Sequence, residues 1–431
     1  MTPPRRLSAS ELRSWLRDGD ELALLDAREQ AAHAYEGHPL LAVSLPWNQV
    51  EHRAAELLPR KSARIVVFDG GDGVLAQRAA ERLGRLGYGA LHLLQGGVAG
   101  WRAAGYEVFT GTNVFSKVFG EVVEAVCSTP RISPAQLRHE LAQQTDLLLI
   151  DSRPADEFQR MHIAGAVNCP AAELPYRFDD LVCSPRTTIV VTCAGRTRGI
   201  LGTQALRNAG VVNEVAVLEN GTMGWLLDGQ TLLYGDTGMA AADAPSALAR
   251  RGAVARTTAL IRRFGISSID AETLSAFASD AHRSLYVFDV RSPDEYAAGH
   301  LPGALSAPGT QLVMLLEDFV GVRHARVVLV DGPDASRAAV TASWLVQMGW
   351  AEVHVLSAAT DLFTEKATPP ADAPVGERWV SPYLLPDEAQ RRQGFEDYLQ
   401  WSAGLVTQFE RDGTHTFRIN SRAAVTEDAL T

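Results

Sequence analysis

The chain has 431 residues, of which 46% are hydrophobic and 21% charged, and its formal net charge at pH 7 is −11. This length predicts two to four domains, and an acidic chain without a Lys/Arg-rich block is not expected to bind nucleic acid. No run approaches the roughly 18 apolar residues of a membrane-spanning helix, and no apolar segment follows the N-terminal basic residues as in a secretory signal. We therefore expect a cytoplasmic protein that neither crosses nor binds a membrane.

An apolar run that ends in Asp-x-Arg occurs three times along the chain. The runs read ALLDAR, LLLIDSR and LYVFDVR, and their aspartates are Asp26, Asp151 and Asp289. A short apolar run followed by polar residues is typical of a buried parallel strand. We expect Asp151 and Arg153 to form a structural pair that fixes the neighbouring loops.

A second set of landmarks follows each run at nearly constant spacing. Another apolar run ends 43, 42 and 42 residues after the aspartates, at Asp69, Cys193 and Asp331. A Gly-bearing loop and a helical pattern that ends near Gly come next. An aromatic residue lies 32 residues after each of these run ends, at Trp101, Trp225 and Phe363. The matching spacing indicates three copies of one unit.

Alternating strand and helix patterns predict parallel βαβ units, with helices on both faces of each sheet. The expected domains are 1–110, 128–238 and 262–370, called here the first, middle and third copies. The segments between them have the pattern of partly helical connectors that dock on their neighbours. Residues 371–431 form a tail that opens with a Pro-rich piece and continues with a candidate amphipathic helix. We expect this tail to pack across the copies.

The loop after the second strand of the middle copy carries the expected chemistry. Ligands bind beyond the carboxyl ends of strands in an open parallel sheet, and this strand ends in Cys193, before a helix that opens near Gly199. Backbone N–H groups in such a loop form a nest for an anion, and the helix dipole, Arg196 and Arg198 add positive charge. These features predict a thiol pKa below the free value of about 8.5, and therefore a thiolate at neutral pH.

Four segments of the middle copy resemble the rhodanese family: LLLIDSR, HIAGAVN, CAGRTR and LENGTMGW. The resemblance covers residues 128–238 and extends more weakly to the other copies. It implies that Cys193 is the catalytic residue and accepts a sulfane sulfur. It also implies that the loop cradles the substrate. The corresponding substrate-binding residues are Ala194, Gly195, Arg196, Thr197 and Arg198.

The reaction implied by this resemblance is a double displacement without a metal or an organic cofactor. The Cys193 thiolate takes sulfur from an anionic donor such as thiosulfate, and a nucleophilic acceptor then removes the sulfur from the persulfide. Mercaptopyruvate is an alternative donor. The acceptor is cyanide, a small thiol or a protein thiol.

The first and third copies have aspartate in place of the cysteine. A carboxylate cannot accept sulfane sulfur, but Asp69 and Asp331 can fill the anion nest with their own charge and cap the following helix. We expect both copies to be catalytically inactive, and to shape the mouth above Cys193 or bind a partner. The first copy also departs from the family pattern after His38.

Structural roles are expected for the other conspicuous residues. His162 is interpreted as a structural histidine, with a proton carrier as the alternative, and Trp225 as a core residue. Cys127, Cys169 and Cys183 match neither a zinc pattern nor a dense disulfide framework. We expect them to be packing residues, with a resolving thiol as the alternative.

Two other functions remain as alternatives. One is a persulfide carrier or redox sensor that serves a single protein partner, which would turn over small donors at negligible rates without that partner. The other is a dual-specificity phosphatase, which needs an arginine six positions after the cysteine. Here the sixth position is Gly199, Arg198 is the fifth, and Thr192 rather than histidine precedes the cysteine.

Overall fold

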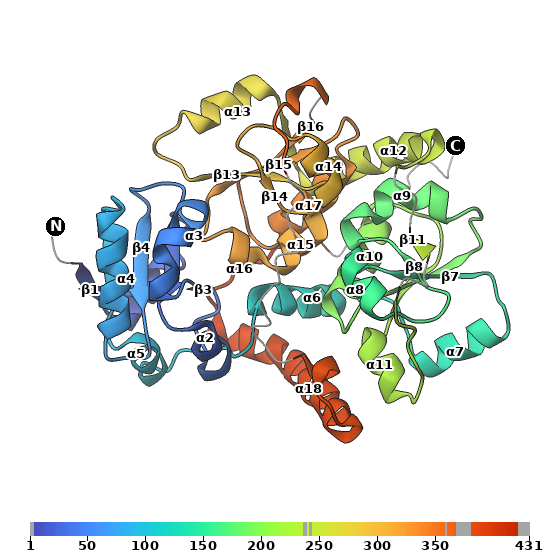
Figure 1. The fold of residues 1–431 in the computed structure, drawn as a ribbon, viewed down its shortest axis with the longest axis horizontal. Helices are drawn as coiled ribbons and strands as arrows, with labels where there is room; N and C mark the ends of the chain where they lie inside the picture. The colour runs from blue at the N-terminus through green and yellow to red at the C-terminus, as the bar shows by residue number, and fades with distance from the viewer. Residues whose placement is uncertain (1–3, 236–238, 241–243, 358–359, 368–380, 421–431) are drawn as a thin grey trace.

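The computed structural model describes residues 4–235, 239–240, 244–357, 360–367 and 381–420. Three parallel sheets with flanking helices follow one another along the chain. They form three lobes that meet around helix α6 (Val114–Cys127), with helix α18 (Glu388–Asp412) below it in the view of Figure 1. The expected architecture of three tandem α/β domains and a helical C-terminal segment is confirmed.

The first copy is a five-stranded sheet in the order β1-β5-β4-β2-β3. Its strands are β1 (Arg5–Leu7), β2 (Leu22–Asp26), β3 (Val43–Ser44), β4 (Arg64–Phe68) and β5 (Leu91–Leu94). Its helices are α1 (Ala9–Trp15), α2 (Gln30–Glu36), the 3₁₀ turn η1 (Trp47–Gln49), α3 (Val50–Leu57), α4 (Val74–Arg85) and α5 (Gly97–Ala103). The last four residues of β4 are all buried, as expected where helices cover both faces of a parallel sheet.

The middle copy repeats this order and adds one edge strand, giving β11-β8-β7-β9-β10-β6. Its strands are β6 (Arg131–Ile132), β7 (Leu147–Asp151), β8 (Val167–Asn168), β9 (Thr188–Thr192), β10 (Val215–Leu218) and β11 (Met239–Ala240). Its helices are α7 (Pro134–Ala142), α8 (Ala155–Arg160), η2 (Ala171–Glu173), α9 (Leu174–Leu181), α10 (Thr197–Asn208) and α11 (Gly221–Leu227).

The third copy has the order β12-β16-β15-β13-β14, which again places the first strand beside the last. Its strands are β12 (Ser267–Ile269), β13 (Leu285–Asp289), β14 (Leu305–Ser306), β15 (Arg326–Asp331) and β16 (Val353–Ser357). Its helices are α13 (Ala271–Ala278), α14 (Pro293–Ala298), α15 (Gly309–Met314), α16 (Leu316–Phe319), α17 (Ser336–Gln347) and η3 (Thr360–Leu362). The shared topology confirms the threefold repeat.

Side-chain caps fix where several of these helices begin. Ser8 before α1 and Ser133 before α7 each accept from the backbone N–H three residues on. The side chains of Glu11 and Gln136 in turn accept from the backbone N–H groups of Ser8 and Ser133. These capping boxes satisfy N–H groups that a helix N-terminus otherwise leaves unpaired.

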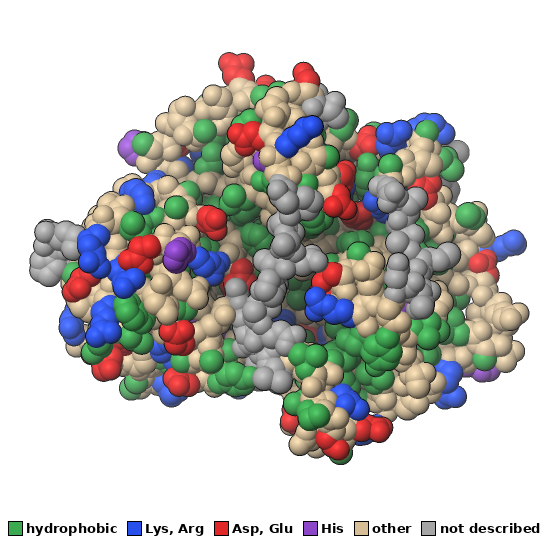
Figure 2. Space-filling view, viewed as in Figure 1, with side chains coloured by type: hydrophobic (Ala, Val, Ile, Leu, Met, Phe, Trp, Pro, Cys, Tyr) green, Lys and Arg blue, Asp and Glu red, His purple; other side chains and the backbone are tan. Residues whose placement is uncertain are grey.

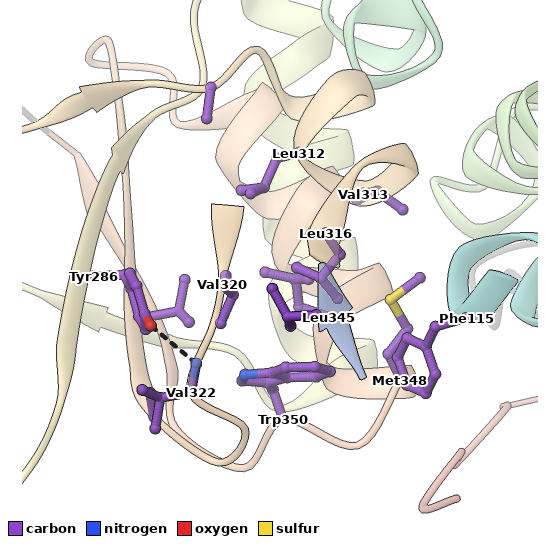
Figure 3. Close-up of a cluster of buried hydrophobic side chains, with 14 of the residues drawn as sticks. Phe115, Tyr286, Leu312, Val313, Leu316, Val320, Val322, Leu345, Met348 and Trp350 are labelled. Carbon is purple, nitrogen blue, oxygen red and sulfur yellow. Dashed lines mark hydrogen bonds between the residues drawn. The ribbon is translucent and has the colours of Figure 1, made fainter. Parts of the chain in front are cut away.

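The connectors between copies are helices that dock on their neighbours, as expected. α6 joins the first and middle copies, and α12 (Ala247–Phe264) joins the middle and third and packs on α9 and α17. Figure 3 shows Phe115 of α6 beside Met348 and Trp350 of the third copy. The ring centroids of Phe115 and Trp350 are 6.0 Å apart in an edge-to-face contact, so the copies share one hydrophobic core.

The C-terminal segment contacts all three copies, which confirms that the tail packs across them. After the turn η4 (Pro382–Leu384), α18 runs beside α6 and α11 (Figure 1). Arg411 forms an ion pair of 2.8 Å with Glu107 at the end of the first copy. Beyond α18, the Arg418 N–H donates to the carbonyl of Gln347 in the third copy. The Pro-rich start of the tail, residues 371–380, and its end, residues 421–431, lie outside the described residues.

The face of the molecule in Figure 2 shows Lys/Arg and Asp/Glu side chains interspersed, without one large basic field. In the part of the chain that the structure describes, no helix combines the length and the apolar character needed to cross a bilayer.

Candidate active site

Cys193 lies at the carboxyl end of β9, where the chain turns into α10. Its side chain is buried, at 2% exposure. The loop wraps the sulfur, because backbone N–H groups of Gly199 and Gly195 both act on the thiol. A methyl group on Gly199 would lie only 3.5 Å from the Sγ. These two N–H groups belong to the nest expected around Cys193, which stays a prediction for the loop as a whole.

The segment that opens α11 supports this loop from behind. Gly221 adopts a φ of +55°, and a Cβ there would lie 2.3 Å from the Cys193 carbonyl oxygen. The N–H groups of Thr222 and Met223 donate to the carbonyls of Cys193 and Ala194 over 2.8 and 3.1 Å. Only glycine permits so close an approach in this backbone conformation. The role of LENGTMGW is thus to hold the cysteine loop.

Arg196 binds carboxylates of the connector helix α6. Its guanidinium donates to both oxygens of Glu121, each over 2.6 Å, and also to Glu124 and to the Asn220 Oδ1. Glu121 is itself 4% exposed on its side chain and accepts from the Ser402 hydroxyl of α18 over 2.6 Å. Arg196 therefore ties the loop to α6 and, through Glu121, to α18.

Arg198 is held in the same way by α8. Its two terminal nitrogens donate to the two oxygens of Glu157 over 2.5 and 2.8 Å. The bidentate geometry is the strongest form of such a pair. Both loop arginines are thus neutralised by protein carboxylates.

The pKa of the Cys193 thiol is raised above its usual value, because burial removes the thiolate from water. The charge of Arg198 and the N–H groups of Gly199 and Gly195 act in the opposite direction without overcoming burial. The expectation of a lowered pKa was therefore wrong. The physical reason is the burial of the sulfur, which outweighs the nearby charge of Arg198.

Two tyrosines of the C-terminal segment form that cover, and the sequence analysis did not identify them. The Tyr383 hydroxyl donates to the Ala194 carbonyl over 2.8 Å. The Tyr398 ring lies against Gly195, so close that a Cβ on Gly195 would be 3.2 Å from the Tyr398 Cε1. Only the amphipathic pattern of the tail helix hinted at such a contact.

Lys117 of α6 is a further cation near the loop that the sequence analysis missed. Its Nζ lies 5.8 and 5.2 Å from the ring centroids of Tyr398 and Trp401 and donates to the Thr112 carbonyl over 2.7 Å. Burial, opposed by the charge of Glu317 and assisted by that of Arg198, lowers the pKa of Lys117 to about 8.

The polar residues predicted to be structural have such roles. Arg153 and Asp151 form a fully buried pair of 2.7 Å, and Arg153 also donates to the Met161 carbonyl. The Nδ1 of His162 lies 3.0 Å from the Phe158 carbonyl oxygen. Trp225 is buried in the core and its Nε1 donates to the Thr231 carbonyl.

The other cysteines differ from one another. Burial raises the pKa of the Cys169 thiol, which is buried, and that of the Cys127 thiol, which is half-buried. Cys183 is exposed, which corrects the expectation that it packs: it follows α9 in a surface loop. Among the described residues, no three His, Cys, Asp or Glu side chains are grouped as metal ligands.

In the first copy, the Asp69 carboxylate occupies the equivalent nest. It accepts from the N–H groups of Gly71, Gly73 and Ala76 over 2.9, 3.1 and 3.2 Å. In this loop, the expectation that the carboxylate fills the nest is confirmed.

In the third copy, the Asp331 carboxylate accepts from the N–H groups of Gly332, Arg337 and Ala338 over 2.8, 2.8 and 3.1 Å. It also pairs with the Arg337 guanidinium over 2.8 Å. Arg337 in turn binds Glu295 of α14. This loop therefore has its own anion and its own cation, and the expectation for Asp331 is also confirmed.

Comparisons with known proteins agree with this arrangement. The family model "Rhodanese-like domain" matches residues 8–104, 133–228 and 270–366. The crystal structure of a thiosulfate sulfurtransferase from Pseudomonas aeruginosa is 34% identical, covers 96% of this chain and 99% of its own, and has a TM-score of 0.89.

Single-domain likenesses are more distant. A rhodanese-related protein from Thermoplasma volcanium is 21% identical over 24% of this chain and 97% of its own, with a TM-score of 0.22. A protein from Anabaena sp. is 28% identical over 24% of this chain and 92% of its own, with a TM-score of 0.23. From its three matched domains and its full-length likeness, the chain is a multidomain member of the rhodanese family.

Proposed function

We propose that this protein is a sulfurtransferase that moves a sulfane sulfur from a small anionic donor to a thiophilic acceptor through a persulfide on Cys193. The observation that carries the proposal is the content of the three equivalent loops. Two of them surround a carboxylate that cannot take up sulfur, whereas the middle loop directs N–H groups at a thiol. The likeness to a thiosulfate sulfurtransferase over nearly the whole chain supports a thiosulfate-like donor.

The proposed reaction has two displacement steps. The thiol releases its proton to water, and the thiolate attacks the outer sulfur of thiosulfate. The S–S bond of the donor breaks, its electron pair leaves with sulfite, and Cys193 keeps the transferred sulfur as a persulfide anion. An acceptor such as cyanide or a thiol then bonds to the outer sulfur, and the pair of the broken S–S bond returns to Cys193.

The loop residues 194–198 are proposed to bind the transferred sulfur through their backbone N–H groups. A persulfide anion would receive the same contacts that Asp69 and Asp331 make in the other copies. The guanidinium groups of Arg196 and Arg198 contribute positive charge to the loop while they stay paired with Glu121 and Glu157.

The cover over Cys193 favours an enzyme for small molecules over a carrier that docks on one protein. Cys193 is 2% exposed and lies beneath Tyr383 and Tyr398. A small anion can reach such a residue more easily than a folded protein partner can. Turnover of thiosulfate with cyanide, or of mercaptopyruvate with a small thiol, separates the two functions, since a dedicated carrier would turn over neither pair.

The direct test is to incubate the purified protein with thiosulfate and to measure its intact mass. We expect a gain of about 32 Da, one sulfur atom, that is lost on reduction and absent from Cys193→Ser. Cys183→Ser is the matched control, because Cys183 is exposed and lies in the same copy. A Cys193→Ser protein that still takes up sulfur would overturn the assignment of the site.

A further inference from the structure

Two hydroxyl groups and one backbone N–H converge on the carbonyl oxygen of Ala194, one residue after Cys193. The Tyr383 hydroxyl lies 2.8 Å from it, the Met223 N–H 3.1 Å and the Thr222 hydroxyl 3.2 Å. The two hydroxyls are also 2.7 Å apart, and because each has one proton, a hydrogen bond between them leaves one of the two to donate to the carbonyl. This carbonyl is therefore held from the side of the C-terminal segment as well as from α11.

The direction of this carbonyl determines the direction of the next N–H. The Ala194 C=O and the Gly195 N–H belong to one planar peptide unit, in which a trans bond makes them point in opposite directions. The Gly195 N–H is one of the two backbone groups that act on the Cys193 sulfur. Holding the carbonyl outward therefore aims the N–H inward at the sulfur.

The Ala194–Gly195 peptide unit needs such a restraint because Gly195 has no side chain to limit its rotation. Tyr383 is well placed to supply it. Its ring packs on that of Phe395, with centroids 4.8 Å apart, and Phe395 is buried at 3% exposure. Pro382 also lies against Gly394 of α18. The hydroxyl is thus fixed by η4 and α18 rather than by the domain that contains the cysteine.

The first copy lacks this contact. The carbonyl of Gly70 corresponds to that of Ala194, and its hydrogen bond comes from the Ala99 N–H over 3.2 Å, as the Met223 N–H serves Ala194. Among the described residues, no tyrosine hydroxyl bonds to the Gly70 carbonyl. The additional hydroxyl contact is found at the loop that has a thiol.

We propose that Tyr383 is a positioning residue for sulfur transfer, which holds the Ala194–Gly195 peptide unit so that its N–H faces the sulfur anion on Cys193. The inference rests on the proposed function of the Cys193 loop and extends it to the C-terminal segment. A chain segment outside the three repeats is then part of the sulfur-transfer site, and the middle copy alone is incomplete.

The test is Tyr383→Phe, which keeps the ring on Phe395 and removes the hydroxyl. We expect the variant to fold, with Cys193 alkylated by iodoacetamide about three- to tenfold more slowly near pH 7, because one hydrogen bond to the loop is lost. The pH at which the rate is half-maximal should rise, and the two proteins should converge at high pH, where the thiol is ionised in both. The groups whose charge acts on Cys193 include Arg198 and Asp151, and the substitution leaves both in place.

Tyr234→Phe is the matched control, because Tyr234 belongs to the middle copy and is 69% exposed. A double-mutant cycle with Thr222→Val should be non-additive, since the two hydroxyls contact the same oxygen and each other. The positioning role is overturned if Tyr383→Phe has the pH profile of the parent protein, or if its rate falls equally at every pH.

Sulfur uptake from thiosulfate, measured in parallel, separates this inference from the proposed function. A parent protein that takes up no sulfur contradicts the proposed function, while its alkylation profile still tests Tyr383. A parent protein that takes up sulfur as fast as Tyr383→Phe does, with identical profiles, contradicts only the positioning role. Slower uptake by Tyr383→Phe at neutral pH supports both.

Discussion

The loop after the second central strand occurs in all three copies, but the charged groups in and around it differ from copy to copy. The first loop satisfies its N–H groups with the Asp69 carboxylate alone. The third adds a buried cation, Arg337, and a second carboxylate, Glu295. The middle loop holds a neutral thiol, and its arginines are compensated by carboxylates from α6 and α8.

The middle loop therefore has no carboxylate in its nest, and the positive charge of its arginines is offset by Glu121 and Glu157. A loop with free arginines would attract any small anion and hold it. With the arginines paired, the N–H groups that act on the Cys193 thiol would suit an anion that is created on Cys193 itself. Substitutions that exchange the features of the loops test this account.

The largest effect is expected from Cys193→Asp, which gives the middle loop the content of the first. Sulfur transfer should fall by more than about 10³-fold, because the nucleophile is gone. The fold should persist, since an aspartate is accommodated in both other nests. Thiosulfate:cyanide turnover and the thermal unfolding midpoint are the measurements. Residual turnover within tenfold of the parent protein would contradict the central role of Cys193.

The next effect concerns the two aspartates. Asp331→Ala should lower the free energy of unfolding by about 3 kcal/mol, because it leaves Arg337 buried with one partner fewer. Asp69→Ala should lower it by about 1 kcal/mol, the value of a lost helix cap, because no buried cation among the described residues is paired with Asp69. Urea unfolding of both variants gives the comparison. Equal losses of unfolding free energy would contradict the dependence of the buried Arg337 on Asp331.

The sequence was sufficient for features that are local. Cys193, its loop and the helix that follows are consecutive residues, so their arrangement follows from a strand, a turn and a helix start. The same holds for Asp69 and Asp331, whose N–H partners lie within seven residues. The threefold repeat could be anticipated because the landmarks recur at fixed spacing.

The features that the sequence concealed depend on contacts between distant segments. Glu121 meets Arg196 across 75 positions and Tyr383 meets Ala194 across 189. No sequence pattern in these segments identifies the distant residues that they contact. The error in the direction of the Cys193 pKa has this origin, because the arginines were visible in the loop, whereas the tyrosines of the distant C-terminal segment that cover it were not.

A smaller effect is expected when one compensating carboxylate is removed. Glu157→Gln leaves Arg198 without its bidentate partner, so the positive charge that lowers the pKa of Cys193 is no longer offset. The pKa should fall toward its usual value, and alkylation of Cys193 near pH 7 should become about two- to fivefold faster. Glu214→Gln, an exposed position of the middle copy, is the control. A slower reaction in Glu157→Gln would mean that Arg198 needs Glu157 to stay near the sulfur.

The smallest expected effect concerns Lys117, whose contacts contrast with those of Arg337. Arg337 has two carboxylates within 3 Å, whereas Lys117 contacts a carbonyl and two rings, and the charge of Glu317 does not prevent burial from lowering its pKa. Its folded-state pKa of about 8 lies below the value of roughly 10.4 for an unfolded lysine. Between these two pH values the unfolded chain binds more protons than the folded one, so the stability of the parent protein rises with pH there.

Lys117→Met removes this dependence. Below pH 8 the variant avoids the cost of burying a charge, and its stability relative to the parent protein should be highest there. That advantage should shrink as the pH rises above 8, because the parent protein then folds with a neutral amine. Lys61→Met, at an exposed lysine that lies over the Tyr88 ring, is the control for losing a lysine on an aromatic face. Urea unfolding at several pH values from 7 to about 9.5 decides the matter, and a difference that stays constant with pH would mean that the pKa of Lys117 is not lowered by folding.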